Sequence, residues 1–521
     1  MNKPEEEKKT QSQILTELAA DCEMFHTPEN DCYAVISVDG HSENWRVRSQ
    51  GFRRWLTRQF YWETGKPPGG QALSDALNVL EARAQFEGEE HSVHIRVEGH
   101  ADEIYIDLCN DNWEVVKIST DGWTIINESP IKFIRAKGML PLPSPEPGGS
   151  LILLRQFMNL QDETSWKLVV GALVASLRGR GPYPILVVQG EQGSAKSTLG
   201  RIIRSLIDPS SAPLRTKPRE ERDLMIAARN GWILGFDNLS GIPNWLSDAL
   251  CRLSTGGGFS TRQLYTDAEE VIFDAQRPCM VNGIDDLAVR DDFRDRAIIV
   301  NLPTIPEEKR QDENTFWQEF EQARPKILGA LLEVVSKAIL NLPSIQLKNL
   351  PRMADFAKWI ASAEPALEWE KGSFLEAYYG NREAAVEIGI EASPIAQAII
   401  ALREPMESDW EGTITELLDE LEEYVPVKIL GIKAWPKNAQ ALSNKLRRLA
   451  PSLRTVGYPM EFDIREGHSR KRKLRIEKDA EKSVRTVRKD DNGNNHFIED
   501  DADDDLLIFP KSQDEIWETS V

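Results

Sequence analysis

Short apolar runs alternate with amphipathic stretches through the middle of the chain. The runs 185–189, 232–237 and 277–282 each end in a polar residue, and the segment 199–207 has apolar residues at helical spacing. Strands that alternate with helices are typical of a parallel sheet with crossover helices. The pattern therefore predicts the fold class α/β, with a core of this kind over residues 151–310.

The rest of the chain divides into segments of different character. Strand-like and helix-like patterns mix before residue 140, Pro and Gly gather just after it, and helical periodicity then extends to about residue 410. Two helical stretches and two short strand-like runs follow, which is the pattern of a winged helix. We expect these further units: a flexible N-terminus (1–30), an α+β domain of unknown role (31–140), a Pro/Gly linker (141–150), a helical region (311–410), a basic winged-helix-like module (411–478) and an acidic disordered tail (479–521).

The composition is that of a globular protein of about three domains. Of the 521 residues, 40% are hydrophobic and 28% charged, and no run of about 18 apolar residues occurs, so we expect no membrane span. The first residues lack an apolar signal region. The five cysteines are scattered, which fits a reducing compartment better than a disulfide framework. We therefore expect a cytoplasmic protein.

Charge is distributed unevenly along this acidic chain, whose formal net charge is −21. Residues 437–478 contain twelve Lys/Arg and four Asp/Glu, whereas residues 490–505 contain eight acidic residues and no Lys or Arg. A local basic excess favours contact with nucleic-acid phosphates. The candidate contacts are Lys445, Arg447, Arg448, Arg470, Lys471, Arg472 and Lys473.

Two alternatives stay open for these charged segments. The basic side chains can equally be the solvated face of an ordinary module. The acidic tail, in which acids adjoin the apolar residues 506–509, can be a hook for a protein partner, a shield for the basic module, or a solubilising segment.

A Gly-rich turn joins the first apolar run to the amphipathic segment. It reads Gly190, Glu191, Gln192, Gly193, Ser194, Ala195, Lys196, Ser197 and Thr198. Backbone N–H groups of such a turn bind a triphosphate, Lys196 neutralises its β/γ end, and the Ser197 hydroxyl reaches Mg²⁺. Ala195 replaces the usual second glycine, at a position where the chain enters the helix and Ala is expected to be tolerated. The turn predicts ATP and Mg²⁺ as ligands.

Asp237, at the end of the second run, is placed to hold Mg²⁺ opposite Ser197. The next residue is Asn238, where a glutamate usually polarises the attacking water. An amide orients water but accepts no proton, so the sequence leaves the rate of hydrolysis open. The alternative for Asp237 is a turn residue at the end of a strand.

The order of these motifs resembles that of AAA+ P-loop ATPases. It is more similar to the superfamily 3 helicase-type ATPases of poxvirus-type primase–helicases and of phage, plasmid and integrative-element replication proteins. The resemblance implies catalytic roles for Lys196, Asp237 and Asn238, and a γ-phosphate sensor role for Asn282. It covers residues 184–305 well and the rest to residue 478 more loosely.

The same resemblance implies a homo-oligomeric ring. Arg296, or otherwise Arg294, would then reach the nucleotide of a neighbouring subunit; the alternative is a surface salt bridge to a nearby aspartate. Two alternating runs between residues 255 and 273 predict a β-hairpin, on which Arg262 would contact nucleic acid or simply face solvent.

Three functions remain possible at this stage. The chain can be a nucleic-acid-dependent ATPase, with helicase-type activity in replication of a phage or mobile element. It can be an ATP-switched loader or phage-sensing assembly ATPase that does not unwind, which Asn238 favours. It can also be a DNA-binding regulator with a vestigial nucleotide site.

Overall fold

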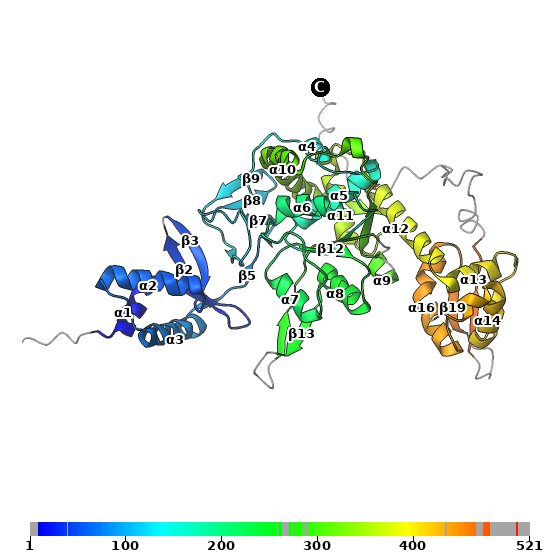
Figure 1. Cartoon of the computed structure of the whole chain (residues 1–521), viewed down its shortest axis with the longest axis horizontal. Coiled ribbons are helices and arrows are strands. Elements are labelled where there is room, and N and C mark those ends of the chain that lie inside the picture. The colour runs from blue at the N-terminus through cyan, green and yellow to red at the C-terminus, as the bar shows by residue number, and fades with distance from the viewer. Residues whose placement is uncertain are drawn as a thin grey trace, which may run out of the picture.

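The computed structural model describes residues 9–38, 40–257, 259–262, 270–273, 275–284, 287, 290–432, 435–464, 472–479 and 507–508. They form three bodies in a row, which we call the N-terminal, central and C-terminal units (Figure 1). The architecture is mixed α/β with a parallel sheet, which confirms the predicted α/β class.

The N-terminal unit packs three helices against one face of a small sheet. Its strands lie in the order β3-β2-β1-β4, and its apolar core includes Leu15, Phe52 and Leu77. The prediction of a flexible N-terminus over 1–30 is wrong for α1 and β1, because Leu15 and Phe25 are fully buried. The elements are α1 (Gln11–Leu18), β1 (Glu23–His26), β2 (Cys32–Val38), β3 (His41–Arg46), α2 (Gln50–Thr64), α3 (Gly70–Phe86) and β4 (Glu89–Glu90).

A second antiparallel sheet, β6-β7-β8-β9, belongs to the central unit. Its apolar side chains Val97, Ile106 and Ile118 share one hydrophobic core with the central helices. The predicted single domain over 31–140 is therefore divided between two units. The elements are β5 (Val93–His94), β6 (Val97–His100), β7 (Glu103–Asp107), β8 (Val115–Ser119), β9 (Gly122–Ile126) and β10 (Lys132–Phe133), and β5 pairs with β10.

The predicted Pro/Gly linker over 141–150 packs on the central unit instead of separating two bodies. Leu142 is buried, and Glu146 donates a backbone hydrogen bond of 3.0 Å to the carbonyl of Pro325. At Gly149 any Cβ would lie 2.0 Å from the Lys326 carbonyl oxygen, so only glycine permits this approach.

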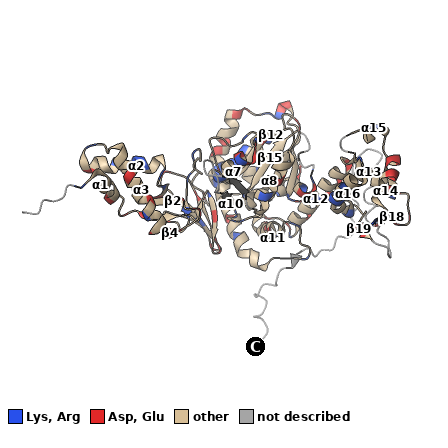
Figure 2. Cartoon of the chain, turned by 90° about the horizontal axis from the view of Figure 1, so that it is seen from below, with Lys and Arg blue, Asp and Glu red and all other residues tan. Residues whose placement is uncertain are grey.

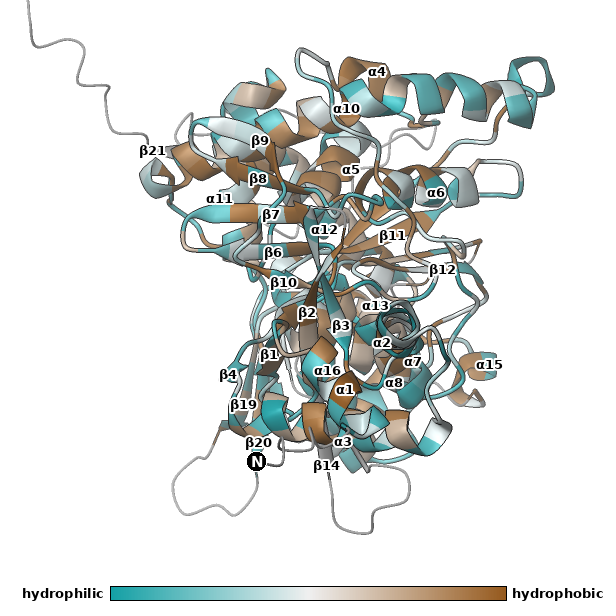
Figure 3. Ribbon diagram, turned by 90° about the vertical axis from the view of Figure 1, so that its left-hand side faces the viewer, coloured by the Kyte–Doolittle hydropathy of each residue, from teal (hydrophilic) through white to brown (hydrophobic). Residues whose placement is uncertain are grey.

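The parallel sheet of the central unit has the order β12-β15-β11-β16. Alternate side chains of β11 enter different cores: Leu186 and Val188 face the core shared with the second sheet, and Ile185 and Val187 face a core formed with α7 and α8. Figure 3 shows the hydrophobic strands enclosed by helices. The elements are α4 (Ile152–Arg155), α5 (Glu163–Ser176), β11 (Ile185–Gln189), α6 (Lys196–Ile207), α7 (Glu221–Arg229), β12 (Leu234–Leu239), α8 (Asn244–Thr255), β13 (Phe259–Arg262), β14 (Glu270–Phe273), β15 (Cys279–Gly283), α9 (Asp291–Arg294) and β16 (Ala297–Asn301).

Helices after the parallel sheet complete the central unit. The elements are η1 (Glu307–Lys309), α10 (Glu313–Asn341), η2 (Leu342–Ser344), β17 (Gln346–Leu347), α11 (Ala354–Ala363), η3 (Glu364–Leu367) and α12 (Ser373–Glu391). The segment Glu313–Ser344 is long and apolar enough to cross a membrane, but 56% of its most apolar stretch is buried within the protein, as in a core helix. Among the described residues it is the one single helix that meets this criterion; α12 and α13 (Pro394–Arg403) meet it only as a pair bent by 92°.

The C-terminal unit has a separate hydrophobic core. Its core begins with Ile390 in the last turn of α12 and continues in α13, so the predicted helical region over 311–410 is shared between two units. The unit also contains three further α-helices and the antiparallel sheet β18-β20-β19, and α16 packs against β19. The elements are β18 (Trp410–Gly412), α14 (Ile414–Leu421), η4 (Glu422–Tyr424), α15 (Val427–Leu430), α16 (Ala439–Thr455), β19 (Met460–Ile464) and β20 (Lys473–Ile476). Most of the predicted acidic tail lies outside the described residues, but Leu507–Ile508 forms β21 and pairs with β17, so the prediction of disorder is wrong there.

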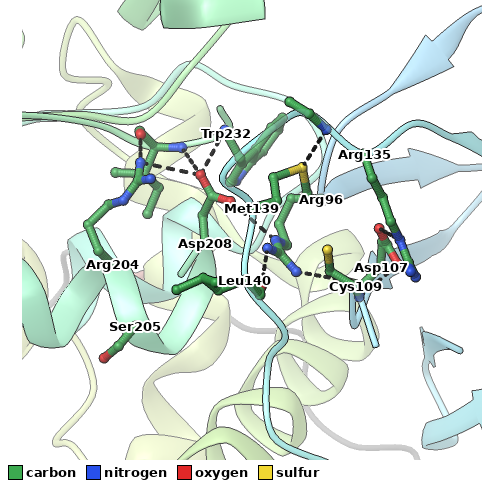
Figure 4. Close-up of polar contacts among 12 residues, drawn as sticks. Arg96, Asp107, Cys109, Arg135, Met139, Leu140, Arg204, Ser205, Asp208 and Trp232 are labelled. Carbon is green, nitrogen blue, oxygen red and sulfur yellow. Dashed lines mark hydrogen bonds and ion pairs between the residues drawn. The ribbon is translucent and has the colours of Figure 1, made fainter. Parts of the chain in front are cut away.

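A buried ionic cluster joins the second sheet to the parallel sheet. The carboxylate of Asp208, 1% exposed, follows α6 and accepts from Arg96 Nε at 3.2 Å, with Arg204 Nη1 at 3.3 Å. Backbone N–H groups of Trp232 and Ile233 donate to the same carboxylate at 2.9 and 3.1 Å. Figure 4 shows Arg96 and Arg204 on opposite sides of Asp208. Every charge in the cluster therefore has a partner, as burial requires.

Candidate functional site

The turn after β11 uses three residues with positive φ. Gly190 has φ 150°, Gly193 has φ 83°, and Ala195 has φ 64°. Ala195 is the N-cap of α6 and adopts the left-handed conformation, which costs a residue with a Cβ about 1 kcal/mol. The structure therefore accommodates Ala195 where the chain enters the helix, as expected, but in a strained conformation that the sequence did not predict. Strained backbone of this kind concentrates at functional sites.

Lys196 and Ser197 lie side by side in the first turn of α6. The Lys196 ammonium donates to the carbonyl oxygens of Gly190 and Glu191, at 2.6 and 2.7 Å. Burial lowers the pKa of this lysine, and the nearby Asp237 carboxylate opposes the shift. The Ser197 hydroxyl donates to Asp237 Oδ1 at 2.8 Å. The hydroxyl, the carboxylate and the ammonium thus meet at a helix N-terminus, which attracts anions.

Asp237, Asn238 and Asn282 lie at the carboxyl edge of the parallel sheet, beside this turn. Val188 pairs with Asn282 in the register of β11 and β15. Asn282 is 2% exposed, and its Oδ1 accepts from the backbone N–H of Asn238 at 2.8 Å. Asn238 has φ 55° and an exposed side chain. Asn282 therefore fixes the backbone that presents the Asn238 amide.

Arg294 and Arg296, the two arginines predicted to reach the nucleotide of a neighbouring subunit, lie at the opposite edge of the sheet. The Arg296 carbonyl accepts from Ile185, the first residue of β11. A five-residue strand separates the edges by roughly 13 Å. Arg296 Nη1 donates to the Asp292 carbonyl at 2.7 Å, and Arg294, 6% exposed, pairs with Asp291. Neither arginine reaches the turn of its own chain.

Sequence reasoning missed two residues that contact the turn. Asn159 Nδ2 donates to the carbonyls of Ser194 at 3.2 Å and Pro303 at 2.6 Å. A Cβ placed on Gly193 would lie 3.9 Å from Arg310 Nη2, so this exposed guanidinium adjoins the turn. Neither residue belongs to a motif or lies near the turn in sequence.

The side chains available here fit Mg²⁺ bound together with a phosphate. No group of three or more His, Cys, Asp or Glu side chains in the described part of the chain is arranged to hold a metal ion. Mg²⁺ retains waters and typically takes one or two protein oxygens beside substrate phosphates. Ser197 and Asp237 supply that small ligand set.

The candidate nucleic-acid residues separate into three groups. Arg262 lies in β13, opposite Glu270 of β14, so the predicted hairpin is present at backbone level. Arg470 and Lys471 lie outside the described residues. The remaining candidates Lys445, Arg447, Arg448, Arg472 and Lys473 lie on α16 or on β20 and the residue before it.

Acidic neighbours partly neutralise the basic side chains at the sheet of the C-terminal unit. Arg447 and Arg472 both pair with Asp463, and their charges hold the pKa of that carboxyl below its usual range. Lys473 pairs with Glu411, whose pKa its ammonium lowers. Exposed pairs of this kind stabilise little, so a phosphate can replace the carboxylates.

Comparisons with known proteins assign part of the chain to a family. Residues 150–381 match the model described as actinomycete integrative conjugative element replication protein. Residues 395–490 match the model of the C-terminal domain of the same protein, RepA. No curated protein matches the chain.

Solved structures give only a distant likeness. The A form apo structure of the NrS-1 C-terminal region is 12% identical, with a TM-score of 0.39, and the match covers 90% of this chain and 99% of that one. Another apo structure of that region, residues 305–718, is 12% identical with a TM-score of 0.36, covering 90% and 99%. The family matches confirm the prediction of a replication protein of a mobile element. Over residues 150–381 and 395–490, the chain belongs to the family of replication proteins of actinomycete integrative conjugative elements.

Proposed function

We propose that the chain is an AAA+ P-loop ATPase that binds ATP with Mg²⁺ and couples this site to nucleic acid during replication. One observation carries the proposal: Ser197 Oγ lies 2.8 Å from Asp237 Oδ1, beside Lys196 in the first turn of a helix. Serine and carboxylate oxygens at that separation are the protein ligands of Mg²⁺ in P-loop sites.

Each neighbouring residue has a defined task in this proposal. Lys196 leaves its contacts with the turn carbonyls and neutralises the terminal phosphates. The exposed Asn238 orients water, and Asn282 holds the Asn238 backbone in place. Mg²⁺, when bound, neutralises charge on the phosphate oxygens and the leaving group. Because Asn238 accepts no proton, we expect slow turnover.

The roles of the other units follow the same proposal. The C-terminal unit is a winged-helix module that contacts DNA. Arg296, or Arg294, lies too far from the turn of its own chain and would complete the site of a neighbouring copy in a ring. Of the functions that such an assembly could have, we favour that of a helicase-type motor.

The test is ATP binding and hydrolysis with Mg²⁺, with and without single-stranded DNA. Lys196→Ala removes a charge-assisted contact to phosphate, which corresponds to roughly tenfold or greater loss of ATP affinity. The matched control is Arg201→Ala on the same helix, since Arg201 is half exposed and pairs with Glu313 away from the turn. Equal ATP affinity in Lys196→Ala and the parent protein would refute the nucleotide site.

A second variant tests why turnover should be slow. Asn238→Glu introduces a carboxylate at the position of a general base, and we expect kcat to rise by at least about tenfold. The matched control is Asn238→Gln, which lengthens the side chain without adding a base and should leave kcat unchanged. An unchanged kcat in Asn238→Glu would show that the amide is not what limits hydrolysis.

Asn238 also favours a second candidate function, an ATP-switched assembly that does not unwind DNA. In that case ATP changes the oligomeric state of the parent protein without any strand separation. Mass photometry with and without ATP, beside an unwinding assay, distinguishes the two. A chain that binds DNA but no ATP would instead be a regulator with a vestigial site.

A further inference from the structure

A charged cleft of about 870 Å³ separates the central unit from the C-terminal unit. Helices α9 and α12 and residue Arg352 form one wall, and α16 forms the other. The Ser452 hydroxyl reaches across to Asp291 Oδ1 at 3.0 Å. In Figure 1, α16 lies on the side of the C-terminal unit that faces the central unit.

Basic side chains predominate in this cleft although the chain as a whole is acidic. Seven Lys/Arg and four Asp/Glu residues line it, whereas the full chain has 63 and 84. Figure 2 shows the basic residues in blue, including those of α16. An excess of one charge within a concave surface attracts ligands of the opposite charge. The ligand expected here is a polyanion.

On the central wall, two guanidinium groups share one carboxylate. Asp295 alone accepts from both Arg352, at 2.9 Å, and Arg382, at 3.2 Å. Arg352 is 44% exposed, so a phosphate can reach it. The ring of Tyr379 lines the same wall, and a base can stack on an aromatic ring of this kind.

The second wall is the outer face of α16. Leu442, Leu446 and Leu453 of this helix point into the core of the C-terminal unit. Lys445, Arg448 and Ser452 lie at helical spacing on another face and line the cleft. Arg448 is exposed, and within the described part of the chain it has no acidic partner.

We propose that this cleft binds the phosphate backbone of a single-stranded nucleic acid, held by Arg352 and Arg382 on one wall and by Lys445 and Arg448 on the other. The proposal rests on the nucleic-acid part of the proposed function and identifies its substrate as a single strand. The volume suits a short stretch of backbone and bases. A duplex does not fit, because the face of α16 that lines the cleft lies against α9 and α12 and is not free to enter a major groove.

The test compares fluorescence anisotropy of the full chain with a labelled oligothymidylate and with a duplex of equal length. We expect tighter binding of the single strand, and a salt dependence whose slope falls by about 0.7 for each phosphate contact removed. Arg448→Ala and Arg352→Ala, one from each wall, should each show that fall and roughly tenfold weaker binding. Both side chains are exposed, so both variants should fold.

Two further variants control for general charge effects. Arg454→Ala removes an exposed arginine of the same helix that does not line the cleft, and should bind like the parent protein. Arg448→Lys keeps the charge and should retain most of the affinity.

Opposite results overturn the proposal in distinguishable ways. If the parent binds neither oligonucleotide, the nucleic-acid part of the proposed function fails. If the parent binds but Arg352→Ala has no effect while Arg448→Ala does, α16 acts alone and the cleft is not the site. Preference for the duplex would also exclude the cleft.

Discussion

Two carboxylates, Asp208 and Asp295, each lie between two arginines at a junction of the central unit. Asp208 joins the second sheet to the parallel sheet and is 1% exposed. Asp295 lines the cleft before the C-terminal unit and is 35% exposed. Both carboxylates pair with two guanidinium groups, but Asp208 also accepts two backbone N–H bonds and is shielded from solvent.

This difference separates a structural junction from a binding surface. At Asp208 the hydrophobic core continues across the junction, and the ionic groups have no access to water. At Asp295 the two units have separate cores, and the arginines keep access to solvent. A buried pair that loses one member leaves an uncompensated charge, whereas an exposed arginine can exchange a carboxylate for a phosphate.

The largest effect is expected for Asp208→Asn. The substitution leaves Arg96 and Arg204 buried without a counter-charge, which costs about 3–5 kcal/mol. Urea unfolding monitored by circular dichroism gives the change in free energy of unfolding. Asp295→Asn is the matched control and should cost less than about 1 kcal/mol because its arginines are hydrated. Similar losses in the two variants would remove the distinction between the junctions.

Asp208 should also make the stability of the protein depend on acid. Burial by itself would raise the pKa of the Asp208 carboxyl, but Arg204, Arg96 and the backbone N–H groups of Ile233 and Trp232 outweigh it and hold the pKa below 3.8. The stability from this ionised group is present above the pKa of the unfolded chain and is lost as pH falls through the lower folded value. Asp208→Asn should therefore unfold with less acid dependence below pH 3.8 than the parent protein.

Separate cores predict separate unfolding transitions. Leu446 is fully buried in the core of the C-terminal unit and Leu331 in that of the central unit. Truncation of either to alanine should cost about 2–5 kcal/mol. Differential scanning calorimetry should show that Leu446→Ala shifts one transition and Leu331→Ala the other. A single transition that both substitutions shift would mean that the central and C-terminal units unfold together as one cooperative unit.

Much of the candidate site follows from sequence because it depends on local order. The turn at residues 190–198 joins a strand to a helix, and Asp237 and Asn282 lie near the carboxyl ends of parallel strands. Carboxyl ends of parallel strands meet at one edge of a sheet, so strand order alone brings these side chains together. The ATP and Mg²⁺ assignments remain predictions.

Contacts between distant segments could not be predicted in this way. Asn159 and Arg310 reach the turn only after the whole central unit has folded. The strands β6 to β9 show ordinary alternation, and their core partner α10 lies some 200 residues later, so sequence spacing assigned them to the wrong domain. The conformation of Ala195 is also set by its surroundings, since its residue type favours the opposite sign of φ.

The smallest expected effect comes from two serines, one buried between α10 and the second sheet and one at the cleft. The Ser336 hydroxyl donates to the Ser119 carbonyl at 2.7 Å, between α10 and β8, and Ser452 contacts Asp291 across the cleft. Ser336→Ala leaves a carbonyl without its donor in a closed interface and should cost about 1–2 kcal/mol. Ser452→Ala should cost about 0.5 kcal/mol, because Asp291 is 24% exposed and still pairs with Arg294.

Urea unfolding of both serine variants measures this difference. The Ser452 variant should also bind single-stranded DNA as tightly as the parent protein, because its hydroxyl supplies no positive charge to the cleft. A larger loss of stability in Ser452→Ala than in Ser336→Ala would show that the contact across the cleft stabilises the protein at least as much as the buried contact between α10 and β8 does. The arginines of the cleft would then not be available to a nucleic-acid strand.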